Sequence, residues 1–507
     1  IKKIGPFQFY GFNNLKSIQL PATITSVGRA AFLDCINLET ACFDGTSTQL
    51  ENIKIEKDND CLLNVIVLKS RKIVFFHSMG SQLQDVLNIA IEEFENKFPG
   101  WTIESVQVGS YDDVKNAVID NLQHNTQPNI AYCYSDHIPN YIATGKVIDL
   151  AKYIHSQDLI EVMMKDRTFQ LERVGFTSEE IADFITGYYN EGKSTNYGNY
   201  SDYGYTSSAM FSLPFSKATE VLYYNESALI DAGITKEVDG KLVAKIPETW
   251  EELWEACSIL KAKYPNSTPL GYDSEGNWFI TMCEQNNWEY TSTQGEHYKF
   301  NNPNTIQWLK NLKEKYELGY FCTQRTLNSY VSSLFTNGAE NGCTFAISSS
   351  ASARYLFSFN NSFEVGVAPI PGSQRSDGVV YKSAIAQGPS LCMLTQGDDE
   401  KDLMAWEFIK LLFEPDFQAE FSIVSGYGPT RKSAYQTEIY KEFLKTDSLL
   451  ALTANVTKSM IENYFTSPAF VGSALAREQV GNAIYYTCIG KKTVQEILEE
   501  AEKNCKK

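Results

Sequence analysis

The chain lacks any uninterrupted apolar run of about 18 residues, the length that a membrane-spanning helix needs. It also lacks a basic excess, because 62 acidic residues outnumber 44 basic ones and the net charge is −18. Nucleic-acid-binding proteins normally present a basic face, so we exclude that class. The 11 cysteines include no C-x-x-C pair and no metal-site spacing, which favours buried single thiols.

Motifs of hydrolytic and nucleotide chemistry are also missing. The five histidines are dispersed, and neither H-E-x-x-H nor G-x-S-x-G occurs. Residues 187–194 satisfy the P-loop expression G-x-x-x-x-G-K-[ST], but the segment before them is helix-like and a Tyr- and Asn-rich loop follows. A phosphate cradle needs a strand before it and a helix after it, so we interpret 187–194 as part of a surface loop. A pair of hydrolytic carboxylates stays open, because sequence spacing does not test it.

What is present is enough chain for two or three domains, with 43% apolar and 13% aromatic residues. The first 43 residues contain a repeat: Ile4-Gly5, Phe9 and Asn14-Leu15 recur as Val27-Gly28, Phe32 and Asn37-Leu38, always 23 residues later. A fixed period of this length is typical of a leucine-rich-type solenoid. The repeated sequence pattern resembles the leucine-rich repeats of the surface-protein class. We therefore predict a leucine-rich-repeat fragment over residues 1–65.

From residue 71 onward the pattern becomes α/β. Residues 72–76 and 102–108 have strand patterns, and apolar residues from Leu83 to Phe98 form one helical face that Pro99-Gly100 ends. Ser110 and Asp113 are spaced as a capping box that opens another helix. Such alternation predicts a mostly parallel, doubly wound sheet.

Residues 211–225 are the most informative segment. A turn at Pro214 leads into Thr-Glu-Val-Leu-Tyr-Tyr-Asn, which predicts a buried strand, and a short helix ends at Gly233. The segment resembles the strand that crosses between the two lobes of the extracellular solute-binding proteins of bacterial ABC importers, especially those for glycerol-3-phosphate and sugars. Further points of resemblance are 76–79, 343–350, 426–427 and 490–493.

The resemblance implies an α/β fold with two doubly wound lobes, joined by hinge crossovers and preceded by the short repeat cap. It places the solute-binding domain at 71–507, with lobe 1 at about 71–186 plus 340–390 and lobe 2 at about 187–339 plus 391–507. It implies a monomer that captures a carbohydrate or polyol between the lobes and passes it to ABC permease subunits, without catalysis or cofactor. We expect an extracellular or periplasmic, lipid-anchored protein whose targeting region is missing from this chain.

Carried over position by position, the resemblance also implies a set of ligand-binding residues. Aromatic rings offer flat faces to sugars, hydroxyl and carboxylate groups hydrogen-bond to ligand hydroxyls, and glycine lets the backbone approach the ligand. The residues are Tyr111, Asp136, Lys217, Trp278, Ser349, Ser350, Gly388 and Tyr427.

Two departures from the family decide the expected ligand. Lys217-Ala218 stands where the family has a pair of serines, and Ala469 stands where it has a phosphate-binding arginine. The guanidinium group of arginine binds phosphate through two parallel hydrogen bonds, whereas the ammonium group of lysine acts as a point charge. We therefore expect a neutral polyol or small saccharide, with glycerol-3-phosphate or a glycerophosphodiester as the alternative. A surface adhesin that acts through the repeats and a glycosidase are two further hypotheses, which deletion of residues 1–65 and turnover of a bound oligosaccharide would respectively reveal.

Overall fold

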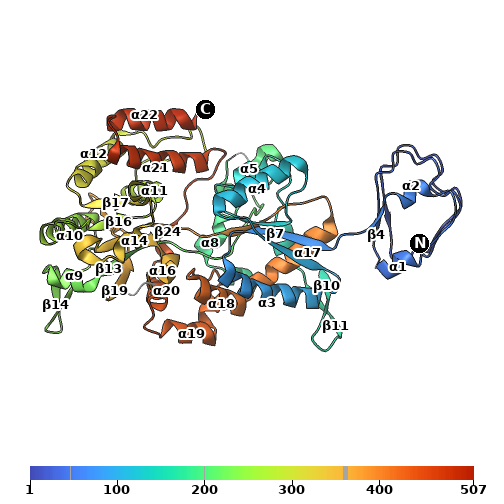
Figure 1. Ribbon diagram of the computed structural model, residues 1–507, viewed down its shortest axis with the longest axis horizontal. Coiled ribbons are helices and arrows are strands. Elements are labelled where there is room, and N and C mark those ends of the chain that lie inside the picture. Colours follow the sequence, from blue (N-terminus) through green and yellow to red (C-terminus); the bar gives the residue numbers. More distant parts are fainter. Residues whose placement is uncertain (46, 199, 358–362, 507) are drawn as a thin grey trace. The chain divides into compact units, whose positions relative to one another are not determined.

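The computed structural model describes residues 1–45, 47–198, 200–357 and 363–506, which divide into two compact units (Figure 1). The first unit is Ile1–Lys72 and the second is Ile73–Lys507.

The first unit is a short solenoid of two parallel ladders. One contains β1 (Lys3–Ile4), β3 (Ser26–Val27) and β5 (Lys54–Ile55), and the other contains β2 (Ser17–Leu20), β4 (Thr40–Phe43) and β6 (Ile66–Leu68); the short helices are α1 (Ser47–Glu51) and α2 (Asp60–Leu63). Ile4 pairs with Val27, so the 23-residue period is the step of the solenoid. Phe9 and Phe32, one period apart, stack with ring centroids 5.0 Å apart. The predicted repeat is confirmed.

The first lobe of the second unit is built on a sheet of order β12-β23-β9-β7-β8. Its strands are β7 (Lys72–His77), β8 (Thr102–Gln107), β9 (Ile130–Cys133), β12 (Leu213–Pro214) and β23 (Ser390–Met393). Its main helices are α3 (Ser81–Lys97), α4 (Tyr111–His124), α5 (Ile138–Ile142), α6 (Ala151–Ile154), α7 (Ser178–Asp183), α17 (Asp399–Leu412) and α18 (Pro415–Ser425). Figure 1 shows α4 on one side of the sheet and α3 and α17 on the other. A hairpin of β10 (Leu159–Met163) and β11 (Phe169–Arg173) is attached to this lobe.

The second lobe is built on a sheet of order β17-β16-β18-β13-β19. Its strands are β13 (Glu220–Asn225), β16 (Leu270–Tyr272), β17 (Phe321–Thr323), β18 (Phe345–Ser349) and β19 (Val365–Pro369). Its main helices are α9 (Glu226–Asp231), α10 (Trp250–Lys263), α11 (Glu275–Asn286), α12 (Pro303–Glu317), α14 (Val331–Phe335), α20 (Leu449–Ser459), α21 (Ser473–Ile489) and α22 (Val494–Cys505). A second hairpin, β14 (Thr235–Val238) with β15 (Lys241–Ala244), follows α9.

The expected lobe boundaries are wrong at three places. Residues from 187 were expected in the second lobe, but β12 pairs with β23 in the first sheet and Phe211 packs in its core. Residues 340–390 were expected in the first lobe, but β18 and β19 pair with β13 in the second sheet. Residues from 391 were expected in the second lobe, but α17 and α18 pack against α3 in the first. A buried apolar strand is recognisable from its composition, whereas the sheet that receives it depends on hydrogen-bond partners far away in the sequence.

Three segments lie side by side at the boundary between the lobes, and we call them the crossovers. Residues 215–219 join β12 to β13, residues 386–389 join β22 (Ala384–Ile385) to β23, and residues 426–430 follow α18. Lys217 pairs with Gly428, and Ala218 pairs with Gln387, both antiparallel. The crossover strand predicted from residues 211–225 is therefore present as β12, the first crossover and β13.

Within the described residues, no helix is long and apolar enough to cross a membrane. The same part of the chain holds no cluster of three or more His, Cys, Asp or Glu residues that could bind a metal ion. All eleven cysteines are free, and most are buried, as the sequence favoured.

Candidate functional site

A cavity of about 1160 Å³ lies between the two lobes, and we call it the cleft. Two of its walls follow β9 and β16, strands that run parallel to β7 and to β18 respectively. Ligands of open α/β sheets bind beyond the carboxyl ends of the strands, which is where residues 134–137 and 273–277 lie. Gln387, Gly388 and Tyr427 of the crossovers contribute to the lining as well.

The wall of the first lobe is aromatic and acidic. Ser110 caps α4 in the predicted capping box with Asp113, which fixes Tyr111 as the first helical residue. The Tyr111 hydroxyl lies 3.1 Å from that of Tyr427, and its ring centroid lies 4.8 Å from that of Tyr134. Burial raises the pKa of Tyr111 and of Tyr427, so both hydroxyls stay protonated and can donate hydrogen bonds.

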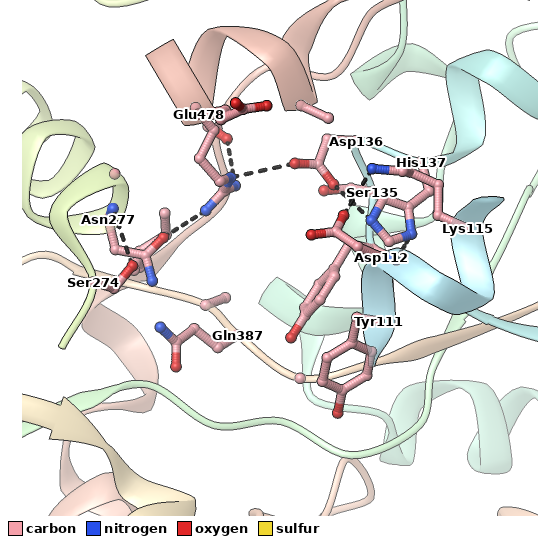
Figure 2. A pocket seen from close by; sticks show the side chains of 18 of the residues that line it. Tyr111, Asp112, Lys115, Ser135, Asp136, His137, Ser274, Asn277, Gln387 and Glu478 are labelled. Carbon is pink, nitrogen blue, oxygen red and sulfur yellow. Dashed lines mark hydrogen bonds and ion pairs between the residues drawn. The ribbon is translucent and has the colours of Figure 1, made fainter. Parts of the chain in front are cut away.

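An ion pair connects the lobes across the cleft. Nε of Arg477, on α21, lies 3.2 Å from Oδ2 of Asp136, which follows β9. Burial raises the pKa of Asp136, but Arg477 and then His137 more than offset this effect, so that the pKa lies below its usual value. Figure 2 shows Asp136 and His137 on one side of the pocket and Ser274 and Asn277 on the other.

Neighbours in the second lobe fix the Arg477 side chain. It donates to Asn277 Oδ1 at 2.6 Å and to Ser467 Oγ at 3.2 Å. Three of its five N–H groups are thus used within the described residues, and two are left for a ligand.

A close approach of α11 to α21 places these groups. A Cβ atom at Gly276 would lie 2.8 Å from the backbone oxygen of Arg477, so only glycine allows this spacing. Ser274 caps α11 by accepting a hydrogen bond from the Asn277 amide. Gly276 therefore belongs to the first turn of a helix.

The structure brings five of the eight expected residues together around the cleft: Tyr111, Asp136, Ser349, Gly388 and Tyr427. Gly388 has φ of +89°, and a Cβ atom there would lie 2.2 Å from the Ser216 carbonyl oxygen. That position requires glycine. Contact of these five residues with a ligand stays a prediction.

Trp278, Lys217 and Ser350 do not line the cleft, and their assignment to it is wrong. Trp278 is fully buried in the core of the second lobe, where it stacks on Tyr272 with centroids 4.4 Å apart. Ser350 is buried, and its Oγ accepts a hydrogen bond from the Thr219 amide. The Lys217 ammonium is buried among protein partners that satisfy it.

Arg477 is the main cleft residue that was not assigned to the site from the sequence, although its charge and its nearness to Ala469 in the sequence made it a candidate cation. Ala469, at the position of the family's arginine, is buried in the core of the first lobe, and the guanidinium in the cleft comes from eight residues further on. Asn277, Ser467, Tyr134 and Gln387 also line the cleft and carried no signal of their own.

Behind Asn277 lies a buried carboxyl group, Glu220, at the start of β13. The Tyr272 hydroxyl donates to its Oε2 at 2.6 Å. Burial raises the pKa of Glu220 to about 8, although the hydrogen bonds with Tyr272 and Asn277 lower it. Glu220 is therefore protonated at neutral pH in the folded protein.

Glu220 makes stability depend on pH. Between its ordinary pKa near 4.5 and its folded value of about 8, the folded state holds a proton that the unfolded state has lost, so stability falls as pH rises through this window. Glu220→Gln cannot ionise. We expect the urea unfolding midpoint of the variant to rise relative to that of the wild type from pH 5 to pH 8. Above pH 8 the difference between the two midpoints should stay constant. Parallel midpoint curves over this range would refute the assignment.

Comparisons with known proteins agree with this geometry. Residues 90–447 match the family described as bacterial extracellular solute-binding protein, and residues 1–70 match the BspA type leucine rich repeat region. The sn-glycerol-3-phosphate-binding periplasmic protein UgpB of Yersinia pseudotuberculosis is 24% identical over 474 residues, which cover 89% of this chain and 96% of that protein.

Solved structures share the fold. UgpB from Mycobacterium tuberculosis, in complex with glycerophosphocholine, has a TM-score of 0.63 and 16% identity, covering 86% of this chain and 97% of that one. The sugar-binding protein MalE from Xanthomonas citri has a TM-score of 0.63 and 16% identity, covering 86% and 96%. The family match spans more than half of the sequence. The chain belongs to the bacterial extracellular solute-binding proteins, with a leucine-rich-repeat unit before the two lobes, and it is a binding protein rather than an enzyme.

Proposed function

We propose that the cleft captures a neutral saccharide and that the protein delivers it to the membrane subunits of an ABC importer. Relatives bind glycerol-3-phosphate, and structural neighbours bind glycerophosphocholine or sugars. The proposal includes action as a monomer and attachment to the membrane surface by a lipid, two features that rest on family resemblance alone.

The observation that carries the proposal is the charge of the cleft. Among the described residues its lining holds six carboxylates, which are Asp112, Asp136, Glu191, Asp273, Glu275 and Glu478, and three cations, which are Lys115, Arg325 and Arg477. Each cation is paired with a carboxylate: Lys115 with Asp112 at 2.7 Å, Arg325 with Glu275 at 3.6 Å, and Arg477 with Asp136. Glu191 is itself paired with Lys217, which lies outside the lining.

A phosphate would enter this cleft without an unpaired cation to meet it. An anion that leaves water needs a counter-charge to offset its lost hydration, and here it would have to compete with carboxylates for every cation. Ligand hydroxyl groups have no such cost, because carboxylates accept hydrogen bonds from them and the free N–H groups of Arg477 donate to them. The rings of Tyr111, Tyr134 and Tyr427 add aromatic faces to the lining.

The test is a thermal-shift screen followed by calorimetry with maltose, maltotriose, glycerol, glycerol-3-phosphate and glycerophosphocholine. A ligand at 100 times its dissociation constant adds about 2.7 kcal/mol of stability. We expect a neutral saccharide to raise the unfolding temperature and glycerol-3-phosphate to leave it unchanged. Micromolar affinity for glycerol-3-phosphate, lost in Arg477→Met, would instead establish the glycerophosphate alternative.

A further inference from the structure

The 187–194 segment has P-loop spacing but does not form a phosphate cradle. It contains a buried carboxylate, Glu191, whose partner lies in the first crossover. Helix α8 (Thr186–Glu191) carries Glu191 at its last position, and Glu191 is buried. Its Oε2 lies 2.7 Å from Nζ of Lys217, which is buried as well and lies in the first crossover. The two side chains form a buried ion pair at the hinge.

The Lys217 ammonium is held by three groups. It forms the ion pair with Glu191, and it donates to the Gly388 carbonyl oxygen and to Ser390 Oγ, each at 3.2 Å. Gly388 belongs to the second crossover and Ser390 begins β23, so the ammonium group joins the first crossover to the second.

The backbone of Lys217 holds the third crossover. Its amide donates to the Gly428 oxygen at 3.1 Å, and the Gly428 amide donates back to the Lys217 oxygen at 2.6 Å. Gly428 follows Tyr427, and both Tyr427 and Gly388 line the cleft. Lys217, in the first crossover, thus contacts the second crossover through its side chain and the third through its backbone.

A buried ion pair is costly because both ions lose their hydration, and its replacement by uncharged groups of similar shape is often neutral for stability. Its retention is better explained by geometry than by stability. We propose that the Lys217–Glu191 pair positions the hinge: it holds the three crossovers in one arrangement and so fixes Gly388 and Tyr427 in the lining of the cleft. This inference rests on the proposed function for the use of the cleft, but its test needs no ligand.

The test is hydrogen exchange on the ligand-free full chain with Lys217→Met and Glu191→Gln combined, because a single substitution would leave a buried charge unpaired. The Ala218, Gln387 and Gly428 amides, which donate hydrogen bonds between crossovers, report on the hinge. We expect them to exchange at least tenfold faster, the amides of β13 and β18 to be unchanged, and the radius of gyration from X-ray scattering to shift.

A matched control is available in the first lobe. Lys410, which is half-buried, and Glu407, which is buried, form another ion pair, 2.9 Å long, within α17 and outside the crossovers. Lys410→Met combined with Glu407→Gln is expected to leave the exchange of the crossover amides unchanged. The proposal would be overturned if the crossover amides of the Lys217/Glu191 variant exchanged as slowly as in the wild type. It would also be overturned if the amides of the sheets were accelerated as much as those of the crossovers. Neither result depends on which solute binds, so a failed saccharide screen and a failed hinge test are separate outcomes.

Discussion

Replacement of Trp278 by alanine is expected to destabilise the second lobe by about 3–5 kcal/mol, the usual cost of removing a buried tryptophan. The side chain is fully buried, and it stacks on Tyr272 with an interplanar angle of 10° and lies 5.8 Å from the Trp250 ring. The alanine variant leaves a large cavity in this aromatic cluster. Urea unfolding followed by circular dichroism measures the loss.

Two controls separate a core role from a ligand role. Trp288→Ala removes a half-buried tryptophan at the edge of the same core and is expected to cost clearly less. Tyr427→Ala removes an aromatic ring that lines the cleft and is expected to weaken saccharide binding more than stability. If Trp278→Ala kept the unfolding midpoint of the wild type but lost affinity for the saccharide, the original assignment of Trp278 to the ligand site would be correct.

The error at Trp278 shows what a single sequence does not decide. Gly276-Asn-Trp278 has the composition of a turn, but Ser274 caps a helix there, and Gly276 serves the contact between α11 and α21. Local residue types allowed both interpretations. The helix also receives a contact from a distant segment, because Arg477, which lies two hundred residues away in sequence, donates to Asn277 Oδ1.

Other features could be predicted because their causes are local. The solenoid step follows from the 23-residue repeat, the capping box of α4 from Ser110 and Asp113, and the crossover from the apolar run that ends at Asn225. Lys217 was singled out as a departure from the family, but the ligand-binding role assigned to it was wrong. Nothing in the sequence indicated that Glu191, on a segment with P-loop spacing, supplies its counter-charge.

Loss of the Arg477 guanidinium is expected to have the largest effect on binding. Arg477→Met removes the two N–H groups left for a ligand and leaves the buried carboxylate of Asp136 without its cation. A hydrogen bond from a charged group contributes about 1.5–3 kcal/mol, so its loss is expected to cost at least tenfold in affinity. Calorimetry with the saccharide selected by the screen measures this loss. Arg477→Lys keeps the charge without the fork and is expected to recover only part of it.

The pH dependence of the ligand-free protein tests the same pair independently of binding. In the wild type the pKa of Asp136 is lowered, so its contribution to stability is present above the ordinary aspartate value and is lost as pH falls through the folded pKa. Without Arg477, burial dominates and the pKa of Asp136 rises above that value. The free energy of unfolding of Arg477→Met should then fall relative to that of the wild type as pH rises from 4 to 7. When Asp136 is replaced by Asn, this difference should disappear, so that Arg477→Met combined with Asp136→Asn has the same pH profile as Asp136→Asn alone. If Arg477→Met and the wild type followed the same pH profile, the ion pair across the cleft would not exist in solution, and the charge argument for a neutral ligand would fail with it.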